Sequence, residues 1–495
     1  MIDGRTERDK GGCMIPNNAI LGLTPLPHDH VVWQQAKPWK IVRSMLAIVF
    51  LCFLLSNVTI LIAAGFLDAN FNYVLGPVDS ILVFSGGLCS LPLIALLLLT
   101  RKPQLTHSIV ATPQAQGATV HPLGGNLVVQ TPVPTHVRHH LVRTNIPLDM
   151  PKTSHLWMIF IFGVVISTLC LLPLALGNIN IFTILLAIFV LIPAWLIGFS
   201  TPVFGWWSIT SRHMGFQIGA KDGELMLMAG MLAGVPAIII NSLLSPIVIT
   251  TFDIPMNSMT DLGYGMILFL SAPIGEEISK ALAVLLLFRY LETPRHGFYV
   301  GSTVGLGFAL VENAQYIMGS LAVGDGGISF LITSIIRGIG SIPGHALWTG
   351  ISGYAIASSL RWKSRDSHSV YDFRSSAPKT EWVLFEKSTG QVVSTSRITA
   401  RPSDWLSRWV MKHRKHAWNL PTNWTQGLII AILGHAFWNG SSWAIGLLEF
   451  ESVVLYALVN IGWIVVLVTI LWLAIVRIVP PIFQVEMKNE VDPLN

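Results

Sequence analysis

Long runs of apolar residues, separated by short polar stretches, dominate the sequence. A helix rises 1.5 Å per residue, so about 20 apolar residues cross the roughly 30 Å hydrocarbon core of a bilayer. Runs of this length lie at about 44–66, 78–100, 156–176, 180–203, 225–250, 265–288, 297–322, 328–360, 425–447 and 452–476. The pattern predicts an all-α fold, a polytopic transmembrane helical bundle of about ten spans.

Apart from Lys280 and Arg337, which lie within predicted spans, the lysine and arginine residues fall in alternate loops, on one side of this predicted bundle. They lie before residue 44, in the loops 101–155, 204–224 and 361–424, between 289 and 295, and after residue 476. The intervening loops have none. Because cytoplasmic loops retain positive charge, both termini are predicted to be cytoplasmic. Residues 1–43 contain no short apolar stretch ending in small residues, so no cleavable signal peptide is expected there.

Composition agrees with a membrane protein and argues against a soluble enzyme. Of the 495 residues, 52% are apolar and only 12% charged, and the mean hydropathy is +0.61, whereas soluble domains carry roughly 25% charged residues. The basic loops explain the net charge of +5, so no nucleic-acid partner is expected. Cys13, Cys52, Cys89 and Cys170 have no CxxC spacing, which supports neither a disulfide framework nor a thiolate metal site.

The two longest loops carry little recognisable chemistry. Residues 101–155 are rich in Pro, Thr and His without periodicity, which predicts a flexible cytoplasmic connector. In the 361–424 loop, residues 380–393 have the pattern of a small hairpin that turns at Ser388, Thr389 and Gly390.

Four consecutive predicted spans contain polar side chains that a bilayer interior normally excludes. A charged side chain at mid-membrane costs a few kcal/mol or more, so such residues usually face a bundle interior and have a function there. From the sixth to the ninth span these residues are Glu276, Glu277 and Lys280, then Glu312 and Asn313, then Arg337 and His345, and finally His435 and Asn439. Measured from the cytoplasmic ends, the glutamates and histidines lie roughly 16 to 26 Å deep. The four helices thus place polar groups in one slab near mid-membrane.

Spacing along the helices predicts some of the pairings. Either glutamate of the sixth span can reach Lys280, at i, i+4 or i, i+3. Adjacent helical residues differ by about 100°, so one of Glu276 and Glu277 is expected to face the site while the other holds Lys280. Lys280 and Arg337 are expected to neutralise buried glutamates. His435 and Asn439 share one helix face.

A short motif occurs twice among these spans. Residues 344–350 read GHALWTG and residues 434–440 read GHAFWNG. The two predicted helices run in opposite directions, and two explanations of the motifs stay open: an inverted pair, or convergent use of Gly for close helix packing. Gly beside His is expected to let a neighbouring backbone approach the imidazole, and Trp348 and Trp438 are expected to wall the site.

At these residues the sequence resembles the PrsW family of intramembrane proteases, which is distantly related to the CAAX prenyl proteases. The family pattern is EExxK on one helix, FxxxE on the next, and later helices with His that end in HxxxD or HxxxN. Here the elements are Glu276 to Lys280, Phe308 to Glu312, Pro343-Gly344-His345, and His435 to Asn439. The resemblance covers about residues 225–447. Asn439 stands where some members have Asp.

The predicted spans and the resemblance together divide the chain into four parts. They are a cytoplasmic tail at 1–43, accessory spans with cytoplasmic loops at 44–224, a PrsW-like catalytic core at 225–447 with a cytoplasmic insertion at about 361–424, and a last span with a cytoplasmic tail at 448–495.

Peptide hydrolysis needs an activated water and a stabilised oxyanion, and the candidate catalytic residues are Glu276, Glu277, Glu312, His345, His435 and Asn439. A buried carboxylate can act as general base and then as general acid, which suits Glu276 or Glu277. His435 and Asn439 could hold the water or donate to the oxyanion. Alternatively, Glu312, His345 and His435 could bind Zn²⁺ with one position open for water. The sequence leaves a metal and a glutamate-only mechanism equally open.

The expected function is that of an endopeptidase in the cell membrane that cleaves a membrane-anchored protein in or near the bilayer. By the resemblance, its partners are membrane lipids and a protein substrate, such as an anti-sigma factor in regulated intramembrane proteolysis, or a prenylated or other peptide. The alternative is a transporter or channel that uses the same Glu and His cluster as a proton or cation relay. A non-catalytic scaffold is disfavoured because all four motif elements are present. The HExxH and GxSxG signatures are absent.

Overall fold

The structure is a computed structural model, and it describes part of the chain. The described residues are 23–24, 38–67, 76–100, 105–124, 127–143, 148, 150–213, 218–256, 258, 260–322, 326–360, 384–385, 392–393, 418–448 and 452–491. They fall into two compact units, one with the strands and one with the helices. Cys13 lies outside the described residues.

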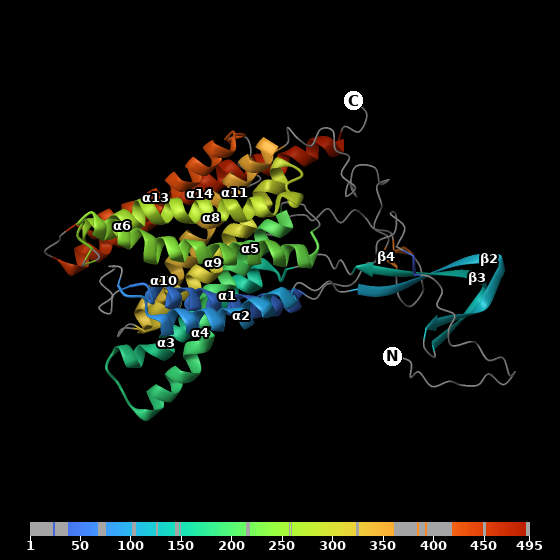
Figure 1. The fold of residues 1–495 in the computed structure, drawn as a ribbon, viewed down its shortest axis with the longest axis horizontal. Helices are drawn as coiled ribbons and strands as arrows, with labels where there is room; N and C mark the ends of the chain where they lie inside the picture. Colours follow the sequence, from blue (N-terminus) through green and yellow to red (C-terminus); the bar gives the residue numbers. More distant parts are fainter. Residues whose placement is uncertain are drawn as a thin grey trace. The chain divides into compact units, whose positions relative to one another are not determined.

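The helical unit contains a helix for each of the ten predicted spans (Figure 1). Its α-helices are α1 (Pro38–Ala64), α2 (Ser80–Thr100), α3 (Thr153–Ala175), α4 (Ile181–His213), α5 (Ala220–Ile239), α6 (Ser245–Thr251), α7 (Leu262–Met266), α8 (Ala272–Leu286), α9 (Pro294–Ala322), α10 (Gly326–Ile336), α11 (Ile342–Leu360), α13 (Trp424–Gly446) and α14 (Val453–Val491). Three π-helical turns, η1 (Ile240–Leu244), η2 (Ile267–Ser271) and η4 (Arg337–Ser341), join α5 to α6, α7 to α8 and α10 to α11. A 3₁₀ turn, η3 (Phe288–Tyr290), follows α8.

Within the described residues, eight of these helices are long and apolar enough to cross a membrane. The helices at 262–286 and 294–322, which match the sixth and seventh predicted spans, are not among the eight. The first of them carries Glu276, Glu277 and Lys280 within five positions. The protein is therefore an all-α membrane protein, and the two predicted spans outside the eight are those that carry Glu276, Glu277 and Glu312.

Each π turn directly precedes a proline. Pro246, Pro273 and Pro343 are the second residues of α6, α8 and α11. A proline offers no N–H to the preceding turn, and its ring clashes with the carbonyl four residues earlier. The wider π turn accommodates this clash without breaking the span. Prolines within apolar spans thus mark positions where the helix register shifts.

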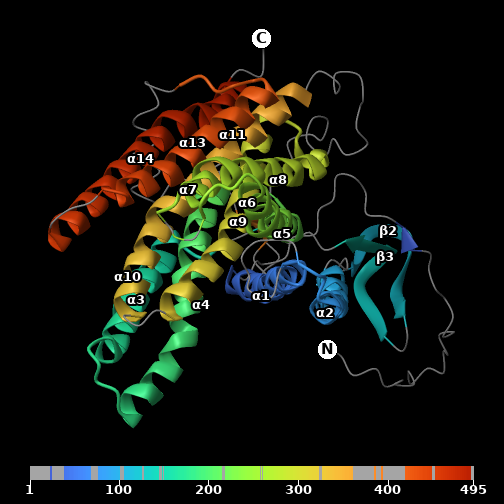
Figure 2. The same cartoon turned by 60° about the vertical axis from the view of Figure 1, so that its left-hand side comes forward.

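Helix α9 is the central element of the helical unit, packed against α5, α8 and α11 (Figure 2). A Cβ atom at Gly301 or Gly305 would collide with a backbone carbonyl of α11, that of Thr349 or of His345. On another face, a Cβ atom at Gly307 would collide with the Leu227 carbonyl of α5. Small residues that admit this approach are typical of membrane helix contacts. The glycines of α9 therefore fix the backbone position of His345.

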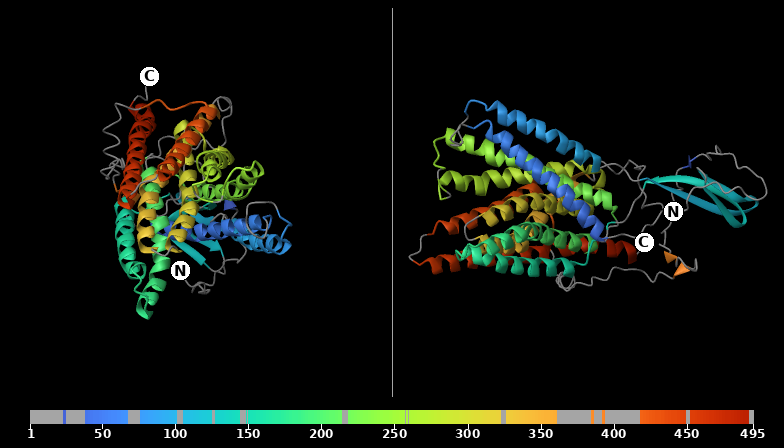
Figure 3. Two further views of the ribbon diagram at one scale, coloured as in Figure 1. Left: turned by 90° about the vertical axis from the view of Figure 1, so that its left-hand side faces the viewer. Right: turned by 90° about the horizontal axis from the view of Figure 1, so that it is seen from below.

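The remaining helices extend this core (Figure 3). Helices α1 and α2 pack together, as do α3 and α4, and α13 packs against both α11 and α14. The Asn423 side chain caps the start of α13 by accepting a hydrogen bond from the Thr425 backbone N–H at 2.9 Å. Gly427 of α13 lies against Ala355 of α11, and Gly434 against Trp348, so the two helices run antiparallel.

The expectation of a flexible connector at 101–155 was wrong. Strand β2 (Leu105–Gly124) pairs antiparallel with β3 (Leu127–Arg143), and β1 (Leu23–Thr24) pairs parallel with β3, in the order β1-β3-β2. Abundant Val and Thr favour strands, and only Gly125 and Asn126 separate the paired ends Gly124 and Leu127, a composition suited to a tight hairpin. The proline-rich composition concealed this pattern.

The predicted hairpin in the 361–424 loop is confirmed where the structure describes it. Strand β4 (Leu384–Phe385) pairs antiparallel with β5 (Val392–Val393). The predicted turn at residues 388–390 lies outside the described residues.

Candidate active site

Four helices bring six of the predicted ionisable residues together inside the bundle. Helix α8 contributes Glu276, Glu277 and Lys280, α9 contributes Glu312, α11 contributes His345, and α13 contributes His435. Five of the six are buried, and the Glu312 side chain is 19% exposed. The two imidazole rings lie 5.1 Å apart between centroids and are nearly perpendicular. Residues up to 159 positions apart in the chain thus form one polar cluster.

Glu277 is the most enclosed carboxylate of this cluster. Its Oε1 accepts hydrogen bonds from Lys280 Nζ at 2.5 Å and His435 Nδ1 at 3.0 Å. Its Oε2 accepts a longer bond from the Thr349 hydroxyl at 3.4 Å. A buried charge is stable only when it is paired and hydrogen-bonded. Glu277 is therefore the member of the glutamate pair that holds Lys280.

The hydrogen bonds give the two histidines different roles. The Lys280 ammonium can only donate, so Nδ1 of His345, 3.1 Å away, accepts. The ring proton of a neutral His345 then lies on Nε2, which is 2.8 Å from Oε2 of Glu312. A carboxylate can only accept, so His435 donates from Nδ1 to Glu277 and keeps a lone pair on Nε2. One ring therefore offers a donor to the cluster and the other an acceptor.

Glu276 presents a carboxylate oxygen that no hydrogen bond occupies. Its Oε1 accepts a bond of 3.1 Å from the Asn241 side-chain amide. Its Oε2 is buried without a hydrogen-bond partner in the described structure, 3.8 Å from both His435 Nε2 and Lys280 Nζ. Glu276 thus has one oxygen held in place and one directed at the histidines.

Asn241 was missed by the sequence analysis. It lies in η1, in the fifth span, which contributes no charged residue to the cluster. The sequence analysis considered ionisable side chains within the spans and therefore did not select Asn241, whose side chain is an uncharged amide in an apolar run. Its position five residues before Pro246, where the span has its π turn, is the signal that could have identified it.

Glu312 lies between His345 and Arg337. Its Oε2 is 3.1 Å from the Arg337 guanidinium, which also donates to the Ser341 hydroxyl at 2.9 Å. The same guanidinium lies over the Tyr316 ring, 3.5 Å from its centroid. Arg337 therefore neutralises a buried glutamate, as the sequence analysis expected, and connects the cluster to Tyr316.

Tryptophans border the cluster as expected. The Trp348 indole stacks on His435 with centroids 4.9 Å apart and planes 14° apart, and Trp438 lies 6.5 Å from Trp348. The expected role of the glycines was wrong: a Cβ atom at Gly434 would lie 2.7 Å from Nε1 of Trp348. Gly434 therefore admits the indole, and not a neighbouring backbone, beside the imidazole.

Asn439, the last residue of the HxxxN element, lies one helical turn beyond His435 and is partly buried. It makes none of the hydrogen bonds or ion pairs found among the described residues. The structure thus brings Asn439 close to the cluster along α13 without connecting it to the other members.

Three side chains could hold a metal ion. One ligand atom each from Glu276, His345 and His435 lies within 4.8 Å of the others, and all three residues are buried. A carboxylate and two imidazoles form a donor set that suits zinc, and the unoccupied Oε2 of Glu276 fits this role. The set expected from the sequence has Glu312 where this group has Glu276.

Comparison with known proteins identifies the same region. Residues 224–374 match the family described as PrsW family intramembrane metalloprotease. The match begins in α5 and includes α8, α9 and α11, whereas His435 and Asn439 lie beyond it. No curated protein and no solved structure matches the chain. Residues 224–374 thus form a domain of the PrsW type of intramembrane metalloprotease, which supports a membrane-embedded peptidase.

Proposed function

We propose that the cluster of Glu276, Glu312, His345 and His435 hydrolyses a peptide bond of a membrane-anchored protein. The observation that carries this proposal is the buried Oε2 of Glu276, which has no hydrogen-bond partner among the described residues and faces the lone pair of His435 Nε2. Two acceptors 3.8 Å apart suit a water molecule that donates to both. Such a water is held ready for attack.

In this proposal Glu276 is the general base and then the general acid. It removes a proton from the water while the water oxygen attacks the carbonyl carbon of the substrate. When the C–N bond breaks, Glu276 returns the proton to the leaving amine. Asn241 holds Oε1, so that Oε2 is the oxygen that exchanges the proton.

His345 suits the oxyanion that forms during the attack. Its Nε2–H is set by the Lys280 contact at Nδ1 and lies 2.8 Å from Glu312 Oε2 in the structure; during the attack it would donate to the oxyanion instead. Preorganised donors of this kind stabilise developing negative charge. Asn439 is a second candidate donor, one turn from His435. Glu277, Lys280 and Arg337 act through the others, as positioning residues.

The family description as metalloprotease makes zinc the proposed cofactor. Glu276, His345 and His435 would hold it, and Glu276 would then be a ligand, so the zinc site and the Glu276 general-base role are alternatives. Zinc bound there supplies a Lewis acid that activates water and polarises the substrate carbonyl. The hydrogen bond from His435 Nδ1 to Glu277 resembles the arrangement that orients metal-bound histidines. Binding through His345 Nε2 would replace its 2.8 Å contact with Glu312 Oε2.

The proposed substrate is a membrane protein cut in or near the bilayer, as in regulated intramembrane proteolysis. The burial of the cluster inside the helical bundle of a membrane protein supports this choice. The proposed location is the cell membrane. Both termini are proposed to be cytoplasmic because loops rich in Lys and Arg stay on the cytoplasmic side of the membrane.

Cleavage of a single-span test substrate by the purified protein in liposomes tests this function. Glu276→Gln and His435→Ala are expected to abolish cleavage, while Ser279→Ala on α8, whose hydroxyl bonds only to the Gly275 carbonyl, should retain it. Flux of protons without any cleavage by the wild type would support the transporter alternative instead.

Metal content provides a separate test of the cofactor. We expect about one zinc per chain, lost in His345→Ala and in Glu276→Gln but retained in Glu312→Gln. Retention of zinc in Glu276→Gln and loss in Glu312→Gln would favour the ligand set expected from the sequence. Full cleavage activity by zinc-free protein would show a glutamate-only mechanism.

A further inference from the structure

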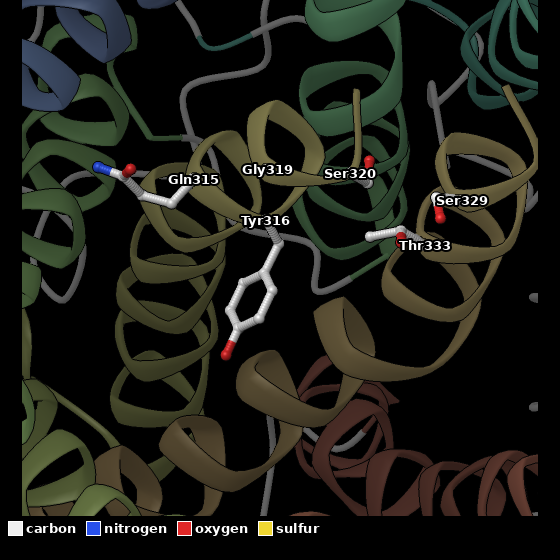
Figure 4. Close-up of a pocket in the computed structure, with 6 residues that line it drawn as sticks. All are labelled: Gln315, Tyr316, Gly319, Ser320, Ser329 and Thr333. Carbon is white, nitrogen blue, oxygen red and sulfur yellow. The ribbon is translucent and has the colours of Figure 1, made fainter. Parts of the chain in front are cut away.

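A pocket of about 440 Å³ lies between α9 and α10, beside the cluster (Figure 4). It is lined by Gln315, Tyr316, Gly319, Ser320, Ser329 and Thr333. The figure shows Ser320 of α9 facing Ser329 and Thr333 of α10 across it. Its volume falls within the roughly 300–1,000 Å³ that is typical of ligand pockets. None of its residues belongs to the cluster described above.

The pocket adjoins the active site through two helices. Tyr316 is one turn beyond Glu312 on α9, and Thr333 is one turn before Arg337. The Arg337 guanidinium contacts the Glu312 carboxylate at 3.1 Å and the Tyr316 ring at 3.5 Å, so it stands between cluster and pocket. At 1.5 Å per residue, Gly319 lies about 10 Å along α9 from Glu312. Three residues of extended chain span that distance.

The surface of the pocket is mostly apolar, but four hydroxyl groups and one side-chain amide line it. Tyr316 is 49% exposed, and neither its hydroxyl nor that of Thr333 makes a hydrogen bond within the described part of the chain. In hydrocarbon such groups need a partner. The amides of a helical peptide are already paired, whereas an extended peptide offers free N–H and C=O groups.

A peptidase requires its substrate in this extended form. In a helix the scissile carbonyl accepts a hydrogen bond and neighbouring side chains surround it, so a membrane-spanning substrate must unwind before water can attack. The unwound backbone needs hydrogen-bond partners near the active site. Hydroxyl groups lining a pocket about three residues away can provide them.

We propose that the pocket between α9 and α10 binds an extended stretch of the substrate's membrane-spanning segment, about three residues from the scissile bond. This inference rests on the proposed function and names where that substrate lies. Gly319 keeps the pocket open, because a Cβ atom added there meets no atom within 4 Å. A large side chain at residue 319 therefore fills the pocket without a clash at its base.

Tryptophan substitution tests the proposal in the full-length protein in liposomes. Gly319→Trp and Thr333→Trp should raise the KM for a single-span substrate about tenfold or more. Most of the resulting loss in kcat/KM should come from KM and not from kcat. The matched controls are Met318→Trp and Ile332→Trp, neighbours that are 42% and 48% exposed and do not line the pocket. Both controls and Gly319→Ala should cleave at close to the wild-type rate.

Cross-linking tests the pocket without requiring turnover. A substrate with a photoreactive phenylalanine analogue three residues from the cleavage site, bound to Glu276→Gln, should attach to residues 315–320 or 329–333. Attachment only elsewhere, or equal cleavage by Gly319→Trp and Met318→Trp, would overturn the pocket assignment and leave the proposed function standing. Absence of cleavage by the wild type would instead refute the proposed function, and the cross-link would still test whether the pocket binds the segment.

Discussion

The Nδ1 atom of His435 lies 3.0 Å from Oε1 of Glu277, although the two residues are 158 positions apart in the chain. Glu277 has no exposed surface and also pairs with Lys280. Its carboxylate therefore fixes the ring of His435 and leaves Nε2 directed at Glu276. Glu277, the neighbour of the proposed base Glu276 on α8, thus fixes the orientation of the His435 imidazole.

Glu277→Gln should lower kcat by about 10- to 100-fold with little change in KM, because it weakens the orienting hydrogen bond without touching the substrate. Steady-state kinetics on the single-span substrate measure this split. Ser279→Ala, on the same helix and also buried, is the control. A rise in KM at constant kcat would show that Glu277 binds substrate directly.

Asn241→Ala should reduce kcat about tenfold, because Glu276 loses the donor that holds its Oε1. Asn241→Asp should be worse, since it places a second carboxylate beside Glu276. The control is Asn460→Ala on α14, where an exposed amide bonds only to the Tyr456 carbonyl. Equal kinetics for Asn241→Ala and wild type would remove Asn241 from the positioning residues.

Arg337→Gln should destabilise the protein by roughly 1–3 kcal/mol, because it leaves the Glu312 carboxylate without its cation. Adding Glu312→Gln should restore part of that stability, as thermal unfolding in detergent would show. Lys221→Gln breaks the more exposed pair with Glu224 and should cost less than about 1 kcal/mol. If the double variant is less stable than Arg337→Gln, the pair is not what stabilises this region.

Gly305→Ala should lower the melting temperature, because the added Cβ atom would collide with the His345 carbonyl and push α11 away. Overpacking of this kind costs about 1–3 kcal/mol. Gly319→Ala adds the same methyl group on the same helix where nothing lies within 4 Å, and should be neutral or stabilising. Equal melting temperatures for the two variants would contradict the close packing of α9 and α11.

The helices and the cluster could be predicted because both depend on local patterns. Apolar runs specify spans, and Glu276, Glu312, His345 and His435 stand out as polar residues within them. The pairing of Glu277 with His435 could not be predicted, because it depends on how α8 and α13 rotate against each other. The orientation of the termini stays a prediction.

The π turns and the hairpin of β2 and β3 were missed by the sequence analysis. The sequence analysis concluded nothing about helix register from the three prolines that follow π turns, so the register shifts at Asn241 and Arg337 went unnoticed. The hairpin of β2 and β3 was concealed because Pro and His within it suggest a loop, although the Val and Thr residues between them favour strands.

The most direct test of the central claim is the rate at which Glu276→Gln cleaves a single-span substrate in liposomes, with the cut mapped by mass spectrometry. The account predicts that the wild type cuts at a single site in or next to the span. It also predicts that Glu276→Gln, which keeps the size and the Asn241 contact of the residue but cannot accept the proton, loses activity by at least about a thousandfold. Cleavage by Glu276→Gln at the wild-type rate would contradict the assignment of this cluster as the active site.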